Sequence, residues 1–177
     1  MNGNSAVRLG LALLAWLALP ALAASLQSQI DATPAGGTLR LAPGSYVGPV
    51  TINKPMTLDG GGKALILGSG KGTVLSVAAS GVTLRGLRLT GSGESHDSVD
   101  SGILLEGDDH RIEDNAIDDV LFGIHLKQVN RSRVSGNRVT GKKLEQGMRG
   151  DAIRLWNSRN NLIEGNRFSR GRDLTFA

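Results

Sequence analysis

A two-part motif occurs three times between residues 102 and 170, and it limits the folds open to this chain. Each part is a short run in which apolar residues alternate with polar ones, and the second part contains an asparagine. The first part occupies residues 102–105, 123–126 and 152–155, and the second part occupies residues 112–117, 134–139 and 163–168. A fainter copy precedes them at residues 75–77 and 84–89. Such internal repetition indicates a repeat architecture built from stacked units.

The spacing and the alternation of the motif favour one such architecture. Successive second parts are 28, 22 and 29 residues apart, so the basic period is about 22 residues. Alternation over so few positions is typical of short strands and not of helices. We therefore predict an all-β fold, a parallel β-helix. Its coils would stack at about the 4.8 Å spacing of hydrogen-bonded strands.

An asparagine takes the same place in each complete copy of the second part, at Asn115, Asn137 and Asn166. Asparagine tolerates the left-handed backbone of a sharp corner, and its amide can bind the equivalent amide one coil away. The shared frame predicts an internal asparagine ladder at one corner. Three unrelated loop asparagines are the alternative.

The ends of the chain differ from the repeats. Residues 1–23 read as a signal peptide, with a basic Arg8, an apolar run over 9–19, Pro20 and an Ala-Leu-Ala cleavage site at 21–23. The apolar run is too short to span a bilayer, although an uncleaved anchor is the alternative. We expect residues 24–177 to form a single β-helix domain that is exported after cleavage. Within it, residues 26–30 predict a short helix that caps the open N-terminal end of the stack.

The sequence stops where a further strand of the repeat is due, at residues 173–177. No capping segment follows the last motif. We therefore expect a C-terminally incomplete β-helix, that is, part of a longer one.

Composition excludes several classes of function. The chain has no cysteine, so neither disulfides nor thiolate ligands are available. Aromatic residues make up 3% of the chain, which argues against stacking platforms for nucleic acid. Charge is uneven, because residues 94–119 hold ten acidic residues and one basic residue, whereas residues 131–172 hold eleven basic and three acidic. Solvated faces explain such runs in most proteins, and a docking surface for a charged partner is the alternative.

The two longer periods insert their extra residues at the same point of the coil, at residues 91–100 and 142–149. The intervening coil has no insertion, so the two loops should project from one edge about 10 Å apart. Loops on a rigid scaffold are where binding sites concentrate. A pocket or docking cleft is therefore expected between them.

A copper site is the sharpest prediction for this cleft. In the first part of the motif the middle residue should point outward, which gives an exposed column: Ser76, Leu104, His125 and Arg154. His125 would lie beside the cleft, His96 on one loop and Met148 on the other. Imidazole and thioether groups suit copper, and the thioether suits the reduced ion especially. The predicted metal ligands are thus His96, His125 and Met148, although a lone surface histidine or methionine usually binds nothing.

Catalysis is the competing interpretation. Aspartates at 97, 100, 108, 109 and 114 suggest calcium-assisted sugar chemistry, as in a polysaccharide lyase or epimerase. Such chemistry needs carboxylates that converge on one outward face. Asp108 and Asp109 instead fall at a turn, and Asp114 takes a corner position that glycine holds in the other copies. A non-enzymatic protein is therefore favoured, and a ligand-free interaction scaffold is a third possibility.

Residues 149–158, RGDAIRLWNS, continue into NLIEGNR at 161–167, and together they resemble the NosD family of periplasmic maturation proteins of nitrous oxide reductase. Residues 37–46 and 55–60 resemble the same family, so the similarity extends over essentially the whole of residues 24–177. Members are generally much longer than this chain.

The resemblance implies a right-handed parallel β-helix that works in the periplasm during copper-site assembly of the reductase. Its implied partners are an ABC transporter permease and ATPase, and nitrous oxide reductase or a copper chaperone. Nucleic acid is not among them, and membrane contact would come only through partners. The family supplies no ligand set that can be transferred by motif, so the three predicted ligands rest on the repeat geometry.

Overall fold

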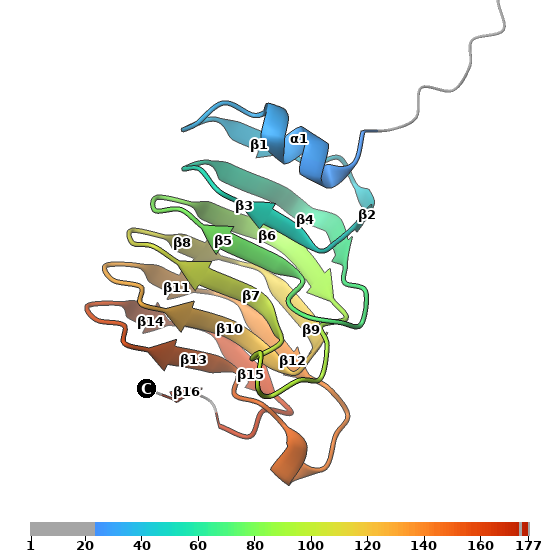
Figure 1. Cartoon of the computed structure of the whole chain (residues 1–177), viewed down its shortest axis with the longest axis vertical. Helices are drawn as coiled ribbons and strands as arrows, with labels where there is room; N and C mark the ends of the chain where they lie inside the picture. The colour runs from blue at the N-terminus through green and yellow to red at the C-terminus, as the bar shows by residue number, and fades with distance from the viewer. Residues whose placement is uncertain (1–23, 174, 177) are drawn as a thin grey trace, which may run out of the picture.

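The computed structural model describes residues 24–173, 175 and 176, and the predicted signal peptide over 1–23 lies outside this part. One short helix, α1 (Leu26–Ala32), precedes a stack of strands (Figure 1). Every strand pair is parallel, which confirms the predicted parallel β-helix. The first sheet, here called sheet A, contains β1 (Thr38–Arg40), β2 (Gly44–Val47), β4 (Thr57–Leu67), β6 (Thr83–Thr90), β8 (Arg111–Glu113), β9 (Ala116–Val120), β11 (Arg133–Ser135), β12 (Arg138–Gly141), β14 (Leu162–Glu164) and β15 (Arg167–Ser169).

The second sheet, sheet B, closes the other side of the coil. It contains β3 (Val50–Ile52), β5 (Leu75–Ala78), β7 (Ser101–Glu106), β10 (Phe122–Lys127), β13 (Ile153–Trp156) and β16 (Thr175–Phe176). These strands are the first part of the sequence motif, and they lie one above another in chain order (Figure 1). Inward-facing Ile103, Ile124 and Ile153 are in register and fully buried, so alternate apolar residues form the core as expected.

Sheet A is divided lengthwise into two rows, because β6 pairs with β8 through residues 83–85 and with β9 through residues 88–90. The first row continues from β8 to β11 and β14. The second row continues from β9 to β12 and β15. The two rows meet at the corner that holds the asparagines.

The predicted asparagine ladder is present at that corner. Asn115 Nδ2 donates to Asn137 Oδ1 at 2.9 Å, and Asn137 Nδ2 donates to Asn166 Oδ1 at 2.9 Å. The left-handed backbone, however, belongs to the preceding residue in each coil, with φ of 55°, 68° and 62°: Asp114, Gly136 and Gly165. The asparagines themselves are thus free to point inward and bind one another, and the prediction that they adopt the left-handed conformation is wrong.

The helix α1 covers the N-terminal end of the stack, as predicted (Figure 1). Leu26 and Ile30 are buried against the core. The side-chain amide of Gln27 also pairs with the edge strand β3, accepting from Thr51 N at 2.9 Å and donating to Thr51 O at 3.0 Å. An edge that would otherwise offer unpaired backbone groups is therefore partly satisfied by a side chain.

The uneven charge of the sequence is largely compensated between coils. Lys127 Nζ lies 2.7 Å from Glu106, and Arg131 lies 3.1 Å from Asp108 and 2.9 Å from Asp109. The acidic segment and the basic segment occupy neighbouring coils, so charges far apart in sequence become partners. Among the residues described, no helix is long and apolar enough to cross a membrane.

Candidate functional site

The two inserted loops meet on one edge of the stack. The first loop joins β6 to β7, and the second joins β12 to β13 and contains a single 3₁₀ turn, η1 (Gln146–Met148). His96 Nε2 lies 3.0 Å from the carbonyl oxygen of Met148. The prediction that the loops project from the same edge is therefore confirmed, and the gap between them is bridged by a direct hydrogen bond.

Lys142 joins the same two loops through charge. Its ammonium lies 3.6 Å from Glu94 of the first loop and 3.6 Å from Asp119, and only 11% of its side chain is exposed. The first loop is also held internally, because Asp100 accepts from Ser95 N at 3.1 Å and from Ser98 Oγ at 2.7 Å. The site is thus built on loops with defined geometry.

Phe122 lies beneath the contact between the loops. Its buried ring meets the His96 imidazole edge to face, with centroids 5.5 Å apart. The guanidinium of Arg154 lies 5.6 Å from the centroid of the same ring, a geometry that attracts the cation to the ring face. The sequence reasoning missed Phe122. The available signal was an aromatic residue where the neighbouring copies of the motif have Ser101 and Asp151.

The outward column of the motif is present, but His125 is not exposed as predicted. Ser76, Leu104, His125 and Arg154 follow one another in register across sheet B. Only 6% of His125 is exposed. Neighbouring long side chains and a residue of the first loop surround it, which the repeat pattern alone did not reveal. They line a hollow of about 190 Å³ together with His125: Val99, Lys127, Arg154 and Trp156.

The environment of His125 keeps its imidazole neutral. Burial, followed by the nearby charges of Arg154 and Lys127, lowers the pKa of His125 to about 4. Its Nε2 is buried and has no hydrogen-bond partner among the described residues. Val99, beside it, adopts a left-handed φ of 53°, which is strained for a β-branched residue. A neutral imidazole with an unbonded Nε2 and a strained backbone at Val99 thus occur together at this hollow.

The predicted copper ligands are only partly brought together. His96 and Met148 are adjacent, but their contact runs to the methionine carbonyl oxygen and not to its sulfur. Met148 is 58% exposed, and His96 Nδ1 makes no hydrogen bond within the described chain. No hydrogen bond joins His125 to either residue in that same part. Among the residues described, no group of three His, Asp or Glu side chains is placed to hold a metal ion.

Four of the five aspartates that suggested catalysis have a structural role, and Asp97 is the exception. Asp108 accepts from Asn130 N at 2.8 Å and from Arg131, and these contacts lower the pKa of the Asp108 carboxyl group. Asp114 holds a left-handed corner, and Asp100 binds its own loop. These aspartates therefore serve the corners and loops of the fold.

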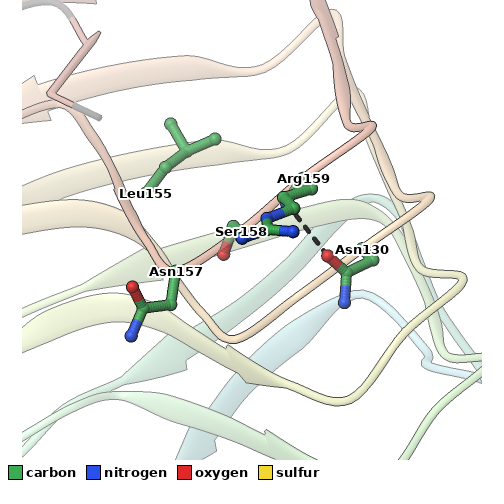
Figure 2. Close-up of a pocket in the computed structure, with 5 residues that line it drawn as sticks. All are labelled: Asn130, Leu155, Asn157, Ser158 and Arg159. Carbon is green, nitrogen blue, oxygen red and sulfur yellow. Dashed lines mark hydrogen bonds between the residues drawn. The ribbon is translucent and has the colours of Figure 1, made fainter.

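A second hollow, of about 400 Å³, lies at the corner that follows β13 (Figure 2). Its polar groups are used to form the corner, because Asn130 Oδ1 accepts from Arg159 N and Ser158 Oγ accepts from Val129 N, both at 3.0 Å. Leu155, which also lines it, is in register with Leu126 of the core. This hollow therefore results from the way the chain turns the corner of the coil.

Comparison with known proteins agrees with this architecture. The family model described as "Right handed beta helix region" matches residues 66–176. The chain belongs to this right-handed β-helix family. No solved structure matched it.

A curated relative extends the comparison. The chain is 30% identical over 164 residues to a protein of Pseudomonas aeruginosa named "Probable ABC transporter binding protein NosD". The match covers 89% of this β-helix chain and 38% of that relative, so the chain spans well under half of the relative's length. The resemblance to NosD inferred from the sequence motifs is confirmed, and the name of the relative describes a binding protein.

Proposed function

We propose that this chain is a periplasmic, non-enzymatic accessory protein of the NosD type, acting in copper-site assembly of nitrous oxide reductase together with an ABC transporter. The observation that carries the proposal is the similarity to NosD over 89% of the chain. The contact between the two loops supports it, because a histidine and a methionine from separate coils are adjacent there.

In this proposal copper is cargo, and His96 and Met148 hold it. His96 offers Nδ1, while its Nε2 remains bonded to the Met148 carbonyl and fixes the ring. The exposed Met148 thioether is a soft ligand that selects the reduced ion. A copper ion held on this exposed edge by so few protein ligands keeps coordination positions open for a donor or acceptor protein. Such a site favours transfer over storage.

His125 is the third proposed ligand. Its Nε2 is enclosed, so a metal ion reaches the ring only through Nδ1. The low pKa of His125 keeps the imidazole unprotonated and able to coordinate at neutral pH.

Copper(I) titration of the whole chain against a chromophoric chelator tests this assignment. Met148→Leu and His96→Gln should each weaken copper binding by about tenfold or more. Removal of a residue that only supports a metal ligand already causes a loss of this size, and removal of a ligand itself should cost at least as much. Met56→Leu is the matched control, because Met56 is 2% exposed in the core and its thioether is remote from solvent. Equal affinity in the Met148→Leu variant and the wild type would remove Met148 from the site. His125→Gln decides the third ligand separately.

The transporter partnership has its own test. The chain is mixed in detergent with the purified permease and ATPase of the transporter, and co-elution is measured by size-exclusion chromatography. Separate elution at all loadings would contradict the partnership without bearing on the copper ligands.

A further inference from the structure

Three arginines form a column on the outer face of the second row of sheet A. Arg88 on β6 is in register with Ala116 on β9, which is in register with Arg138 on β12 and then Arg167 on β15. These strands follow one another down the stack (Figure 1). The three arginine side chains are exposed. They therefore line up parallel to the axis of the solenoid.

The first row of the same sheet treats its arginines differently. Each outward arginine there has a carboxylate within 4 Å, on its own strand or on another coil: Arg40, Arg85, Arg111 and Arg133. In contrast, the side chains of Arg88, Arg138 and Arg167 form no hydrogen bond or ion pair with any residue in the described part of the chain. Two rows of one sheet thus carry arginines at comparable density, and only one row neutralises them internally.

An unpaired column of this kind opposes folding. Arg138 and Arg167 are direct neighbours in the parallel ladder, about 4.8 Å apart along the axis. Like charges directly opposite each other on a sheet are destabilising. A counter-charge from outside the chain would relieve the repulsion, and the guanidinium group is suited to bind it because its planar fork matches a carboxylate.

The column also contains a place for such a group. Ala116 has only a methyl group, so a hollow of about 140 Å³ opens between Arg88 and Arg138, two coils apart. Leu65, Thr90 and Asp118 also line the hollow, and Asp118 forms no ion pair with either arginine. The hollow is smaller than the several hundred Å³ of a small-molecule pocket and fits a single side chain.

Exposed apolar residues extend the same face toward the N-terminal end. Leu65 is in register with Arg88, and Leu67 is in register with Thr90. Leu67 and its neighbour Val47 are 37% and 80% exposed. The surface is therefore amphipathic, with an apolar end and a basic column.

We propose that this face binds an acidic peptide segment of a partner protein. One carboxylate occupies the hollow between Arg88 and Arg138, a second binds Arg167, and an adjoining apolar side chain rests on Leu65 and Leu67. Three arginines fall short of the roughly four to eight basic residues typical of a site for anionic membranes. No aromatic side chain lines the hollow, as stacking with nucleic acid bases would require.

The test uses a defined probe, the capped peptide Val-Ser-Glu-Ser-Glu-Ser, and its counterpart with both glutamates replaced by glutamine. In an extended peptide the two glutamates are about 7 Å apart on one side, within reach of long arginine side chains. Calorimetric titration of the full chain at low salt should detect binding of the glutamate peptide, at least tenfold tighter than the glutamine peptide. Equal binding of the two peptides, or no binding of the glutamate peptide, would overturn the proposal.

Variants separate this column from net charge. Arg138→Gln should weaken binding about two- to fivefold, as expected for one exposed ion pair, and the triple glutamine variant about 10- to 100-fold. Arg40→Gln is the matched control, because it removes the same charge from an arginine whose side chain is 79% exposed on the other row. Weakening by Arg40→Gln equal to that by Arg138→Gln would refute a specific column.

Two further arms address the occupant. Ala116→Glu places a carboxylate of the chain itself in the hollow, and it should weaken peptide binding while the melting temperature stays at or above that of the wild type. Unchanged peptide affinity in a folded Ala116→Glu protein contradicts the assigned place of the carboxylate. Vesicles of phosphatidylglycerol and phosphatidylcholine are the last probe. If the protein binds the vesicles through these arginines and does not bind the peptide, the peptide proposal is wrong and the ligand of this face is an anionic membrane.

Discussion

Replacement of Asn137 by alanine tests the asparagine ladder as the element that holds the coils together. Asn137 is 1% exposed, and its Oδ1 accepts from both the backbone and the side chain of Asn115 at 3.0 and 2.9 Å. Its Nδ2 donates to the Ile112 carbonyl at 2.8 Å and to Asn166 at 2.9 Å. The alanine variant therefore leaves the buried backbone N–H of Asn115 without its partner, whereas the Ile112 carbonyl belongs to β8, which remains paired with β11. At about 1–3 kcal/mol for an unsatisfied buried group, the expected loss of stability is about 1–3 kcal/mol.

Asn166→Ala is the matched comparison. Asn166 makes the same kinds of bond, to Val134 O and from Asn137 N, but it is half-buried, so water can replace its amide. Its loss should cost about 1 kcal/mol. Urea unfolding followed by circular dichroism measures both values from the midpoints, provided that the slopes agree. If Asn137→Ala costs no more than Asn166→Ala, the ladder is not a main source of stability.

Two other properties follow from the structure. Gly123→Ala should lower the melting temperature strongly, because the new Cβ would collide with the backbone carbonyl of Ala152, whereas Gly147→Ala meets no atom and should be neutral. The imidazole of His125 should titrate near pH 4 by NMR, and a midpoint near 6.5 would show that it is not enclosed. As the pH falls, the His125 imidazole takes up a proton at a higher pH in the unfolded state than in the folded state. The free energy of unfolding should therefore fall as the pH decreases from about 6.5 toward 4. His125→Gln should reduce this dependence without abolishing it, because burial lowers the pKa of His110 as well.

The parts of the fold that depend on the repeat were predictable from the sequence. The period of about 22 residues, the alternation and the recurring asparagine predicted parallel coils and the ladder, because each depends only on a residue's place in the motif. The meeting of His96 with Met148 was also predictable, since both insertions occur at the same point of the coil. Alignment of the repeats carried these inferences without any knowledge of side-chain packing.

What the repeat could not predict depends on side chains that break the pattern. The burial of His125 results from neighbours such as Val99, Lys127 and Trp156, which occur in only one copy each. Phe122, where neighbouring coils have small or acidic residues, fills the space beneath His96. The left-handed corner lies one residue before the asparagine, a shift that a propensity argument cannot resolve. Carboxylates neutralise one row of arginines and not the other, and this difference could be recognised only from the ion pairs of the folded chain.

The asparagine ladder also bears on how such a protein can change its length during evolution. Asn115 and Asn137 are 22 residues apart and bind each other as identical neighbours. If one whole period were duplicated or deleted, each remaining asparagine would still meet an equivalent amide in the next coil. The number of coils could therefore change without loss of the hydrogen bonds at this corner. Insertions confined to the rim, like those that carry His96 and Met148, leave that corner untouched. The number of coils and the surface loops can therefore change during evolution while the asparagine corner inside the stack stays the same.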